Sequence, residues 1–218
     1  KPVLATGKPD RLWVGHDYRS LQVLETNGWR SVAAWPNIDA IGSITALYED
    51  RQGRCWVGTG RGVLCRDQEE WTFYSTTNGL SHADVRVIYQ DRRDDIWFGT
   101  YGGGLNRLHD GRITSYATQF GEYNNRAWWI HEDADGIFWV GSQNGLNRFV
   151  PPGVDDASAK PRPSTPQPST LNSQPLWRQN SVGRLRHNEL RQFRLFILDH
   201  FMFSGRWGRS SAQRVLRV

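Results

Sequence analysis

The chain has 218 residues, of which 38% are hydrophobic, and it carries a formal net charge of +5. Residues 1–150 hold sixteen Lys/Arg and eighteen Asp/Glu, whereas residues 151–218 hold eleven and four, so the basic character belongs to the second part. Two cysteines exclude a disulfide framework and a Cys-rich zinc site. The longest apolar stretch, residues 195–203, is too short to span a bilayer, and the first six residues lack the apolar run of a secretory signal.

A Trp-x-Gly motif recurs at a nearly constant interval along residues 1–150. Its anchors are Trp13, Trp56, Trp97 and Trp139, which lie 43, 41 and 42 residues apart. In the last three copies, an Asp stands six residues before the tryptophan (Asp50, Asp91, Asp133) and a glycine stands two residues after it (Gly58, Gly99, Gly141). A repeat of about 42 residues has the length of a β-propeller blade.

Each copy divides into short strands rich in β-branched and aromatic residues, with turn residues between them. In the first copy Gly7 replaces the Asp, and only residues 3–5 remain of the first strand. The second copy predicts strands at residues 44–49, 55–59, 63–66 and 71–74, and the third at residues 85–90, 96–100, 105–108 and 113–116. The fourth predicts strands at residues 128–132, 138–142 and 146–149 and stops short of a fourth strand. We therefore expect an all-β propeller of about 3.5 blades, an incomplete ring, over residues 1–150.

The second part of the chain contains no repeat. Residues 151–175 hold most of the prolines, which predicts an extended linker. Residues 176–218 form an Arg-rich tail, for which we predict either disorder or a short helix from about Asn188 to Phe203. The arginines follow no recognisable binding motif, so we expect no specific nucleic-acid partner.

Repetition itself indicates a structural role for the framework residues. A tryptophan and a glycine two residues later face the same side of a strand, where the ring can pack on the next blade. An Asp in a turn accepts backbone N–H bonds, and three acids in different blades cannot share one substrate atom. The histidines lack metal-ligand spacing, and Asp133-Ala-Asp135-Gly136 lacks the later ligands of a calcium loop. We predict no catalytic residue, no metal and no cofactor.

Cys55 and Cys65 flank one predicted hairpin, across which they could face each other. Because cross-strand disulfides are strained and small buried thiols are common, we predict two free cysteines.

The repeat pattern resembles the two-component regulator propeller repeat. The matching text runs from Asp91 through Gly99-Thr100 to Gly104-Leu105, from Asp133 to Gly145-Leu146, and includes Asn78-Gly79-Leu80 between blades. In that family the repeats build the extracytoplasmic sensor part of hybrid histidine kinases, which recognises carbohydrates or their breakdown products. The resemblance implies a periplasmic, non-catalytic recognition module, of which this chain is a fragment or truncated copy.

Recognition residues are expected where the copies differ. In a propeller, the loops that join blades and the hairpins between second and third strands gather on one face, and aromatic, amide and Arg side chains there suit a sugar or uronate. The candidate ligand-binding residues are Tyr18, Arg19, Trp35, Asn37, Arg61, His82, Tyr101, Tyr123, Asn124, Arg126, Gln143 and Asn144.

Other readings remain open at the level of the sequence. One is a scaffold that binds proteins, and another is a propeller enzyme of the quinoprotein or lyase type, although neither the quinoprotein signature nor a clustered acid-base set is found. An open set of blades leaves an unpaired edge and an uncovered Trp-rich face. We therefore expect further blades, or another copy of the chain, as partners that complete the ring, besides a glycan or small-molecule ligand.

Overall fold

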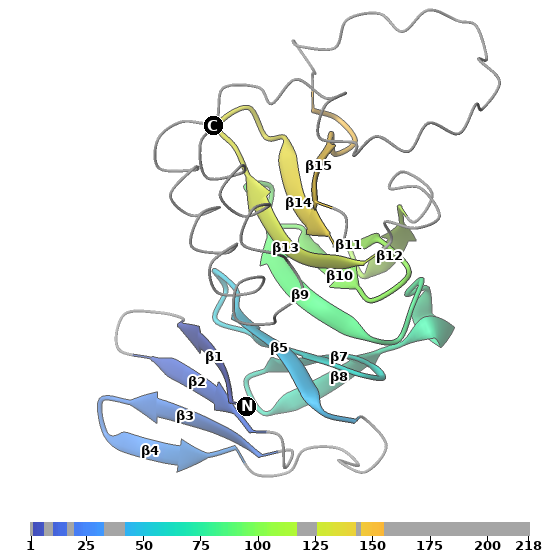
Figure 1. The fold of residues 1–218 in the computed structure, drawn as a ribbon. Coiled ribbons are helices and arrows are strands. Elements are labelled where there is room, and N and C mark those ends of the chain that lie inside the picture. Colours follow the sequence, from blue (N-terminus) through green and yellow to red (C-terminus); the bar gives the residue numbers. More distant parts are fainter. Residues whose placement is uncertain are drawn as a thin grey trace, which may run out of the picture. The chain divides into compact units, whose positions relative to one another are not determined.

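The computed structural model describes residues 2–6, 11–16, 20–32, 42–116, 126–142 and 145–154. These residues form four antiparallel sheets that follow one another along the chain (Figure 1). Within each sheet the strands pair in sequence order, as expected for propeller blades, so the predicted all-β class is confirmed. The linker and tail beyond residue 154, including the helix predicted near residues 188–203, lie outside the described residues.

Three blades have four strands and the last has three. Blade 1 comprises β1 (Val3–Thr6), β2 (Leu12–Gly15), β3 (Leu21–Glu25) and β4 (Gly28–Ser31); blade 2 comprises β5 (Ile44–Glu49), β6 (Cys55–Thr59), β7 (Gly62–Asp67) and β8 (Glu70–Tyr74). After the short 3-10 helix η1 (Thr76–Asn78), blade 3 comprises β9 (Val85–Gln90), β10 (Ile96–Thr100), β11 (Leu105–His109) and β12 (Arg112–Ser115). The described strands of blade 4 are β13 (Ala127–Glu132), β14 (Phe138–Ser142) and β15 (Gly145–Phe149). Strand β1 pairs with β2 along its full length, so the first copy keeps its first strand.

The first turn of blades 2, 3 and 4 contains a residue with positive φ. Gly53 and Gly136 adopt φ values of 88° and 81° in blades 2 and 4. In blade 3 this position is Asp94, which adopts φ 70°, a conformation that Asp tolerates better than most residues. The third copy therefore closes the same turn without its glycine.

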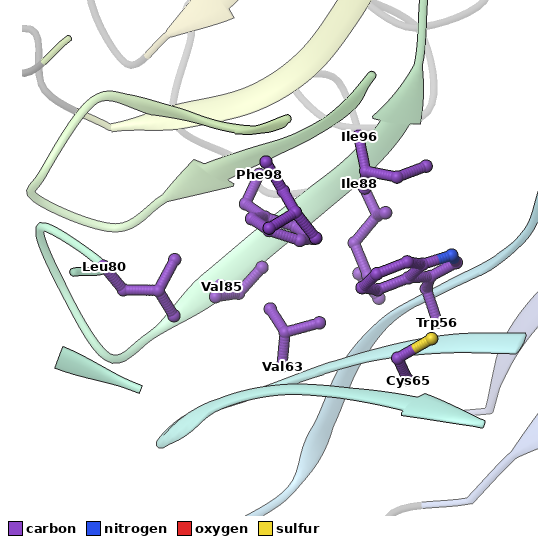
Figure 2. Packing of buried hydrophobic residues seen from close by; sticks show 10 residues of the cluster. Trp56, Val63, Cys65, Leu80, Val85, Ile88, Ile96 and Phe98 are labelled. Atoms are coloured by element: carbon purple, nitrogen blue, oxygen red, sulfur yellow. The ribbon is translucent and has the colours of Figure 1, made fainter. Parts of the chain in front are cut away.

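Tryptophans fill the spaces between neighbouring blades. Trp56 of blade 2 is 1% exposed and packs, with Cys65, against Ile88 and Phe98 of blade 3 (Figure 2). The Trp56 and Phe98 ring centroids are 5.7 Å apart. Equivalent clusters form around Trp13 between blades 1 and 2 and around Trp97 between blades 3 and 4. The anchors are thus the apolar core that holds consecutive blades together.

The glycine after each tryptophan lets the next blade approach closely. A Cβ built on Gly99 would lie 2.4 Å from Cγ1 of Val87 and 2.9 Å from Cβ of Ala127, the first residue of β13. These distances are too short for any side chain. Gly99 therefore keeps the space in which blade 4 contacts blade 3.

The two cysteines lie on opposite faces of blade 2. In the pairing of β6 with β7, Cys55 is opposite Arg66, whereas Cys65 is opposite Trp56. Cys55 therefore packs toward blade 1 and Cys65 toward blade 3. Both are buried free thiols, and the suggestion that they face each other is wrong.

In the described part of the chain, no helix has the length and apolar character needed to cross a membrane.

Candidate functional site

The framework aspartates bind both a turn and a tryptophan. Asp91 Oδ1 accepts hydrogen bonds from the backbone N–H of Arg93 and Asp95, at 2.9 and 3.0 Å, and its Oδ2 accepts the indole N–H of Trp97 at 2.8 Å. Asp50 and Asp133 accept the indole N–H of Trp56 and Trp139 in the same way, at 2.7 and 2.8 Å. Both carboxylate oxygens are therefore used by the fold, and the bond to the ring was not foreseen from the sequence.

Blade 1 lacks this Asp and uses a residue of the next blade instead. The Trp13 indole N–H donates to Oε2 of Glu49, which is the last residue of β5, and Arg11 donates to Oε1 of the same side chain at 3.1 Å. Glu49 is buried in the described structure. The copy that appeared damaged in sequence thus keeps an acceptor for its tryptophan.

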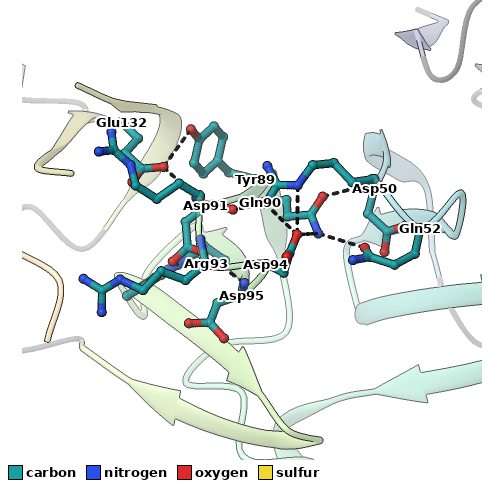
Figure 3. A network of polar contacts seen from close by, with 12 residues as sticks. Asp50, Gln52, Tyr89, Gln90, Asp91, Arg93, Asp94, Asp95 and Glu132 are labelled. Carbon is teal, nitrogen blue, oxygen red and sulfur yellow. Dashed lines mark hydrogen bonds and ion pairs between the residues drawn. The ribbon is translucent and has the colours of Figure 1, made fainter. Parts of the chain in front are cut away.

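The equivalent residues of blades 3 and 4 also connect consecutive blades (Figure 3). Gln90 Oε1 accepts the backbone N–H of Arg51 at 2.8 Å, and Glu132 Oε2 accepts that of Arg92 at 3.0 Å. Arg51 also donates from Nε to Asp94 at 2.8 Å, and this hydrogen bond lowers the pKa of the Asp94 carboxyl. This polar network belongs to the framework and leaves the loops at the other end of the strands for recognition.

Three of the predicted recognition residues lie at or next to the hairpin between β10 and β11 of blade 3. Tyr101 follows β10, its N–H donates to the carbonyl of Asp84 at 2.8 Å, and it forms a β-bridge with Arg126. The guanidinium carbon of Arg126 lies 4.2 Å from the Tyr101 ring centroid, and that of Arg86 lies 4.9 Å from it. His82 Nδ1 accepts the N–H of Asp84 at 3.1 Å. We name these five residues the Tyr101 cluster.

The Tyr101 cluster combines hydrogen-bond donors with a carboxylate. Asp84 Oδ2 accepts from Arg86 at 2.5 Å, whereas Asp84 Oδ1 is buried and has no hydrogen-bond partner within the described structure. The Tyr101 ring packs against two guanidinium groups, each within the range of a cation–π contact. The cluster therefore offers guanidinium donors and a carboxylate acceptor, rather than a bare aromatic surface.

The other candidates are placed elsewhere or are not described. Arg61 occupies the equivalent hairpin of blade 2, where its Cγ lies near Gly42, so it belongs to a different blade junction from the Tyr101 cluster. The remaining candidates lie outside the described residues: Tyr18, Arg19, Trp35, Asn37, Tyr123, Asn124, Gln143 and Asn144.

Two arginines in strands were not predicted, because recognition residues were expected only in loops. Arg86 lies within β9, at a position occupied by Thr45 and Trp128 in blades 2 and 4. Arg66 lies within β7, and its Nε–H is buried without a partner among the described residues, an arrangement that costs about 1–3 kcal/mol for a hydrogen-bonding group. A comparison of the copies at strand positions, as well as at loop positions, identifies Arg86 and Arg66 as residues that differ between blades.

The matches to known proteins agree with this architecture. The family model for the two-component regulator propeller matches residues 40–61, 79–102 and 124–144. The matched segments are two-component regulator propeller repeats. None of the curated protein sequences matches the chain.

Solved structures share the propeller fold of this regulator-propeller segment. It is similar to the extracellular domain of a B. thetaiotaomicron protein described as a hybrid two-component system (19% identity, TM-score 0.57), covering 69% of this chain and 21% of that one. A second B. thetaiotaomicron extracellular domain, described as part of a one-component system, gives 20% identity and a TM-score of 0.58, with 70% and 23% covered. Virginiamycin B lyase from Staphylococcus aureus gives 18% identity and a TM-score of 0.54, with 70% and 56% covered. The chain thus spans less than a quarter of either of the two B. thetaiotaomicron extracellular domains.

Proposed function

We propose that this chain is a non-catalytic recognition segment of an extracytoplasmic sensor propeller, and that its Tyr101 cluster contributes to a site for a carbohydrate or a carbohydrate derivative. The regulator-propeller repeats and the likeness to extracellular domains of two-component systems support the sensor role. Because the chain spans only part of those domains, we propose that it acts as a fragment of a larger propeller.

The proposed class of ligand is supported above all by Oδ1 of Asp84, a carboxylate oxygen that has no hydrogen-bond partner among the described residues. A sugar presents several hydroxyl groups that both donate and accept hydrogen bonds. Asp84 Oδ1 would accept from such a hydroxyl, while the Arg86 and Arg126 guanidinium groups would donate to ring oxygens, hydroxyls or a uronate carboxylate.

The test is a glycan-array screen of the chain, followed by titration of any sugar that binds. We expect the Tyr101→Ala variant to lose at least tenfold in affinity, because it removes the ring that positions both guanidinium groups. Phe73→Ala is the matched control, since Phe73 is an exposed aromatic side chain of β8. If no sugar binds and a pull-down instead recovers a protein partner, the sensor role is wrong and the scaffold role is favoured.

A lyase-type activity is the second candidate, because one observation favours it. Asp95 is buried, and its Oδ1 lies 2.5 Å from His109 Nδ1, a geometry in which a histidine can act as a general base. Asp95 also accepts from Arg107 Nε at 2.8 Å, so the carboxylate is shared with a strand residue. Elimination products formed by the wild-type chain from a substrate bound beside His109, at the opposite end of β10 from Tyr101, and lost in His109→Gln, would favour this activity over recognition alone.

A further inference from the structure

A polar cleft of about 310 Å³ lies between blades 1 and 2. Its walls include the turn at Gln52 and Gly53, the turn at residues 67–69, and the blade 1 arginines Arg11 and Arg30. These turns are at the opposite ends of the strands from the hairpins and joining loops that hold the Tyr101 cluster. The cleft is therefore separate from the site of the proposed function.

Arg66 lines this cleft at a position that is apolar in every other blade. The residue paired opposite the one before the anchor tryptophan is Leu24 in blade 1, Leu108 in blade 3 and Phe149 in blade 4. Leu108 and Phe149 pack in the clusters between blades. In blade 2 the same position is Arg66, opposite Cys55. A position that is apolar in blades 1, 3 and 4 is thus occupied by a charged side chain in blade 2, where it lines the cleft.

The partner of Arg66 is weakly held. The Arg66 side chain is 9% exposed, and its Nη2 donates at 2.6 Å to Oε1 of Glu69, which is 85% exposed. The Arg66 Nε–H has no partner among the described residues. A buried guanidinium needs an anionic partner. An exposed carboxylate loses side-chain entropy when it is held in an ion pair, and it is hydrated again when the ion pair breaks. Glu69 can therefore give way to another carboxylate at little cost.

The remaining charges of the cleft favour a ligand with a single negative charge. Arg11 and Arg30 contact Glu25 through Nε, at 3.2 and 3.6 Å, and Arg30 is 48% exposed. Three arginines line the cleft together with the three acidic residues Glu25, Asp67 and Glu69. This balance disfavours a dianion such as phosphate. A carboxylate matches the planar fork of an arginine, whereas Glu69 occupies only one of its donors, the Nη2–H.

We propose that the cleft between blades 1 and 2 binds a small organic carboxylate, which replaces Glu69 on Arg66 and pairs with both the Nη2–H and the Nε–H. The cleft volume suits a small molecule. Arg30 provides a second cation near the entrance. The site is independent of the Tyr101 cluster, so either can exist without the other.

The experiment is an NMR titration of the arginine Nε–H signals of the whole chain with sodium acetate, at constant ionic strength set with sodium chloride. We expect a saturable shift of the Arg66 signal, and at least threefold tighter binding in Glu69→Gln, which removes the competing carboxylate. Arg66→Leu, which installs the residue found in blade 3, should remove the site without lowering the urea midpoint. Arg112→Leu, which removes the same charge from an exposed strand position, should leave acetate binding unchanged.

Three results would overturn the proposal. The first is an Arg66 signal that shifts no more than that of Arg112. The second is unchanged acetate affinity in Glu69→Gln. The third is inorganic phosphate binding with the same affinity as acetate, because the charge balance of the cleft would then not select a monoanion.

Discussion

Replacement of Asp91 by alanine tests whether the framework aspartates stabilise the fold. Asp91 is 4% exposed and accepts three hydrogen bonds, one of them from the indole N–H of Trp97, which is fully buried. In Asp91→Ala, the indole N–H and the buried backbone N–H of Asp95 lose their acceptor, whereas water can reach the N–H of Arg93. Each buried donor left unsatisfied costs about 1–3 kcal/mol. For two such donors we therefore expect the free energy of unfolding to fall by about 2–6 kcal/mol, a large part of the 5–15 kcal/mol typical of a domain.

Urea unfolding followed by tryptophan fluorescence measures this loss. The matched control is Asp94→Asn in the same turn, since Asn also tolerates positive φ and the ion pair with Arg51 is exposed and screened by solvent, so its loss should change the urea midpoint little. Asp91→Asn should lie between the two, because its amide oxygen still caps the turn while its NH₂ group faces the indole N–H. Equal midpoints for Asp91→Ala and Asp94→Asn would refute the structural role.

Three further predictions concern packing, ionisation and surface charge. Gly99→Ala should lower the free energy of unfolding by about 1–3 kcal/mol, because the added Cβ overpacks against Val87 of blade 3 and Ala127 of blade 4. Gly60→Ala should be nearly neutral in the same urea assay, because nothing lies within 4 Å of its added Cβ. Equal effects of the two substitutions would contradict the close approach of the blades. Burial raises the pKa of the Cys65 thiol to about 12, and that of Cys55 well above its usual value of 9.0, so the stability that the neutral thiols provide is complete below pH 9 and is lost as the pH rises through 12. The urea midpoint should fall between pH 8 and pH 11, and fall less in the Cys55→Ala/Cys65→Ala variant; an identical fall would show that the thiols are not involved. Arg51→Ala should cost less than about 1 kcal/mol in low salt, and less still in 1 M salt, because its ion pair is half exposed; a larger cost would indicate that the bonds to blade 3 are a main support.

The sequence predicts the strands well where consecutive repeats share the same pattern of apolar residues and turn residues. The strands around Trp56, Trp97 and Trp139 are found within one residue of their observed bounds, because the alternation of apolar residues and the turn chemistry are local. The acceptor that Trp13 uses in blade 1 was not predicted, because Gly7 stands where the other copies have Asp and the acceptor, Glu49, lies 36 residues beyond Trp13. Contacts between residues so far apart in the sequence depend on how the blades pack on one another. The alternation of apolar residues along a strand carries no information about that packing.

The residues of the candidate sites were likewise predicted only in part. Tyr101 and Arg126 were predicted because propeller topology brings blade-joining loops next to hairpins. Arg86 and Arg66 were not, because strand positions were taken as framework. Only the register of the sheets reveals that Arg66 stands where the other blades have Leu or Phe.

The hydrogen bond from Trp13 to Glu49 indicates the order in which blades 1 and 2 open during unfolding. Opening of blade 2 withdraws Glu49 and leaves the Trp13 indole N–H without its acceptor, whereas opening of blade 1 leaves the Asp50–Trp56 bond of blade 2 intact. In native-state hydrogen exchange, the amides of β2 should therefore exchange at least as fast as those of β6. We therefore expect fraying to proceed from blade 1 toward blade 2.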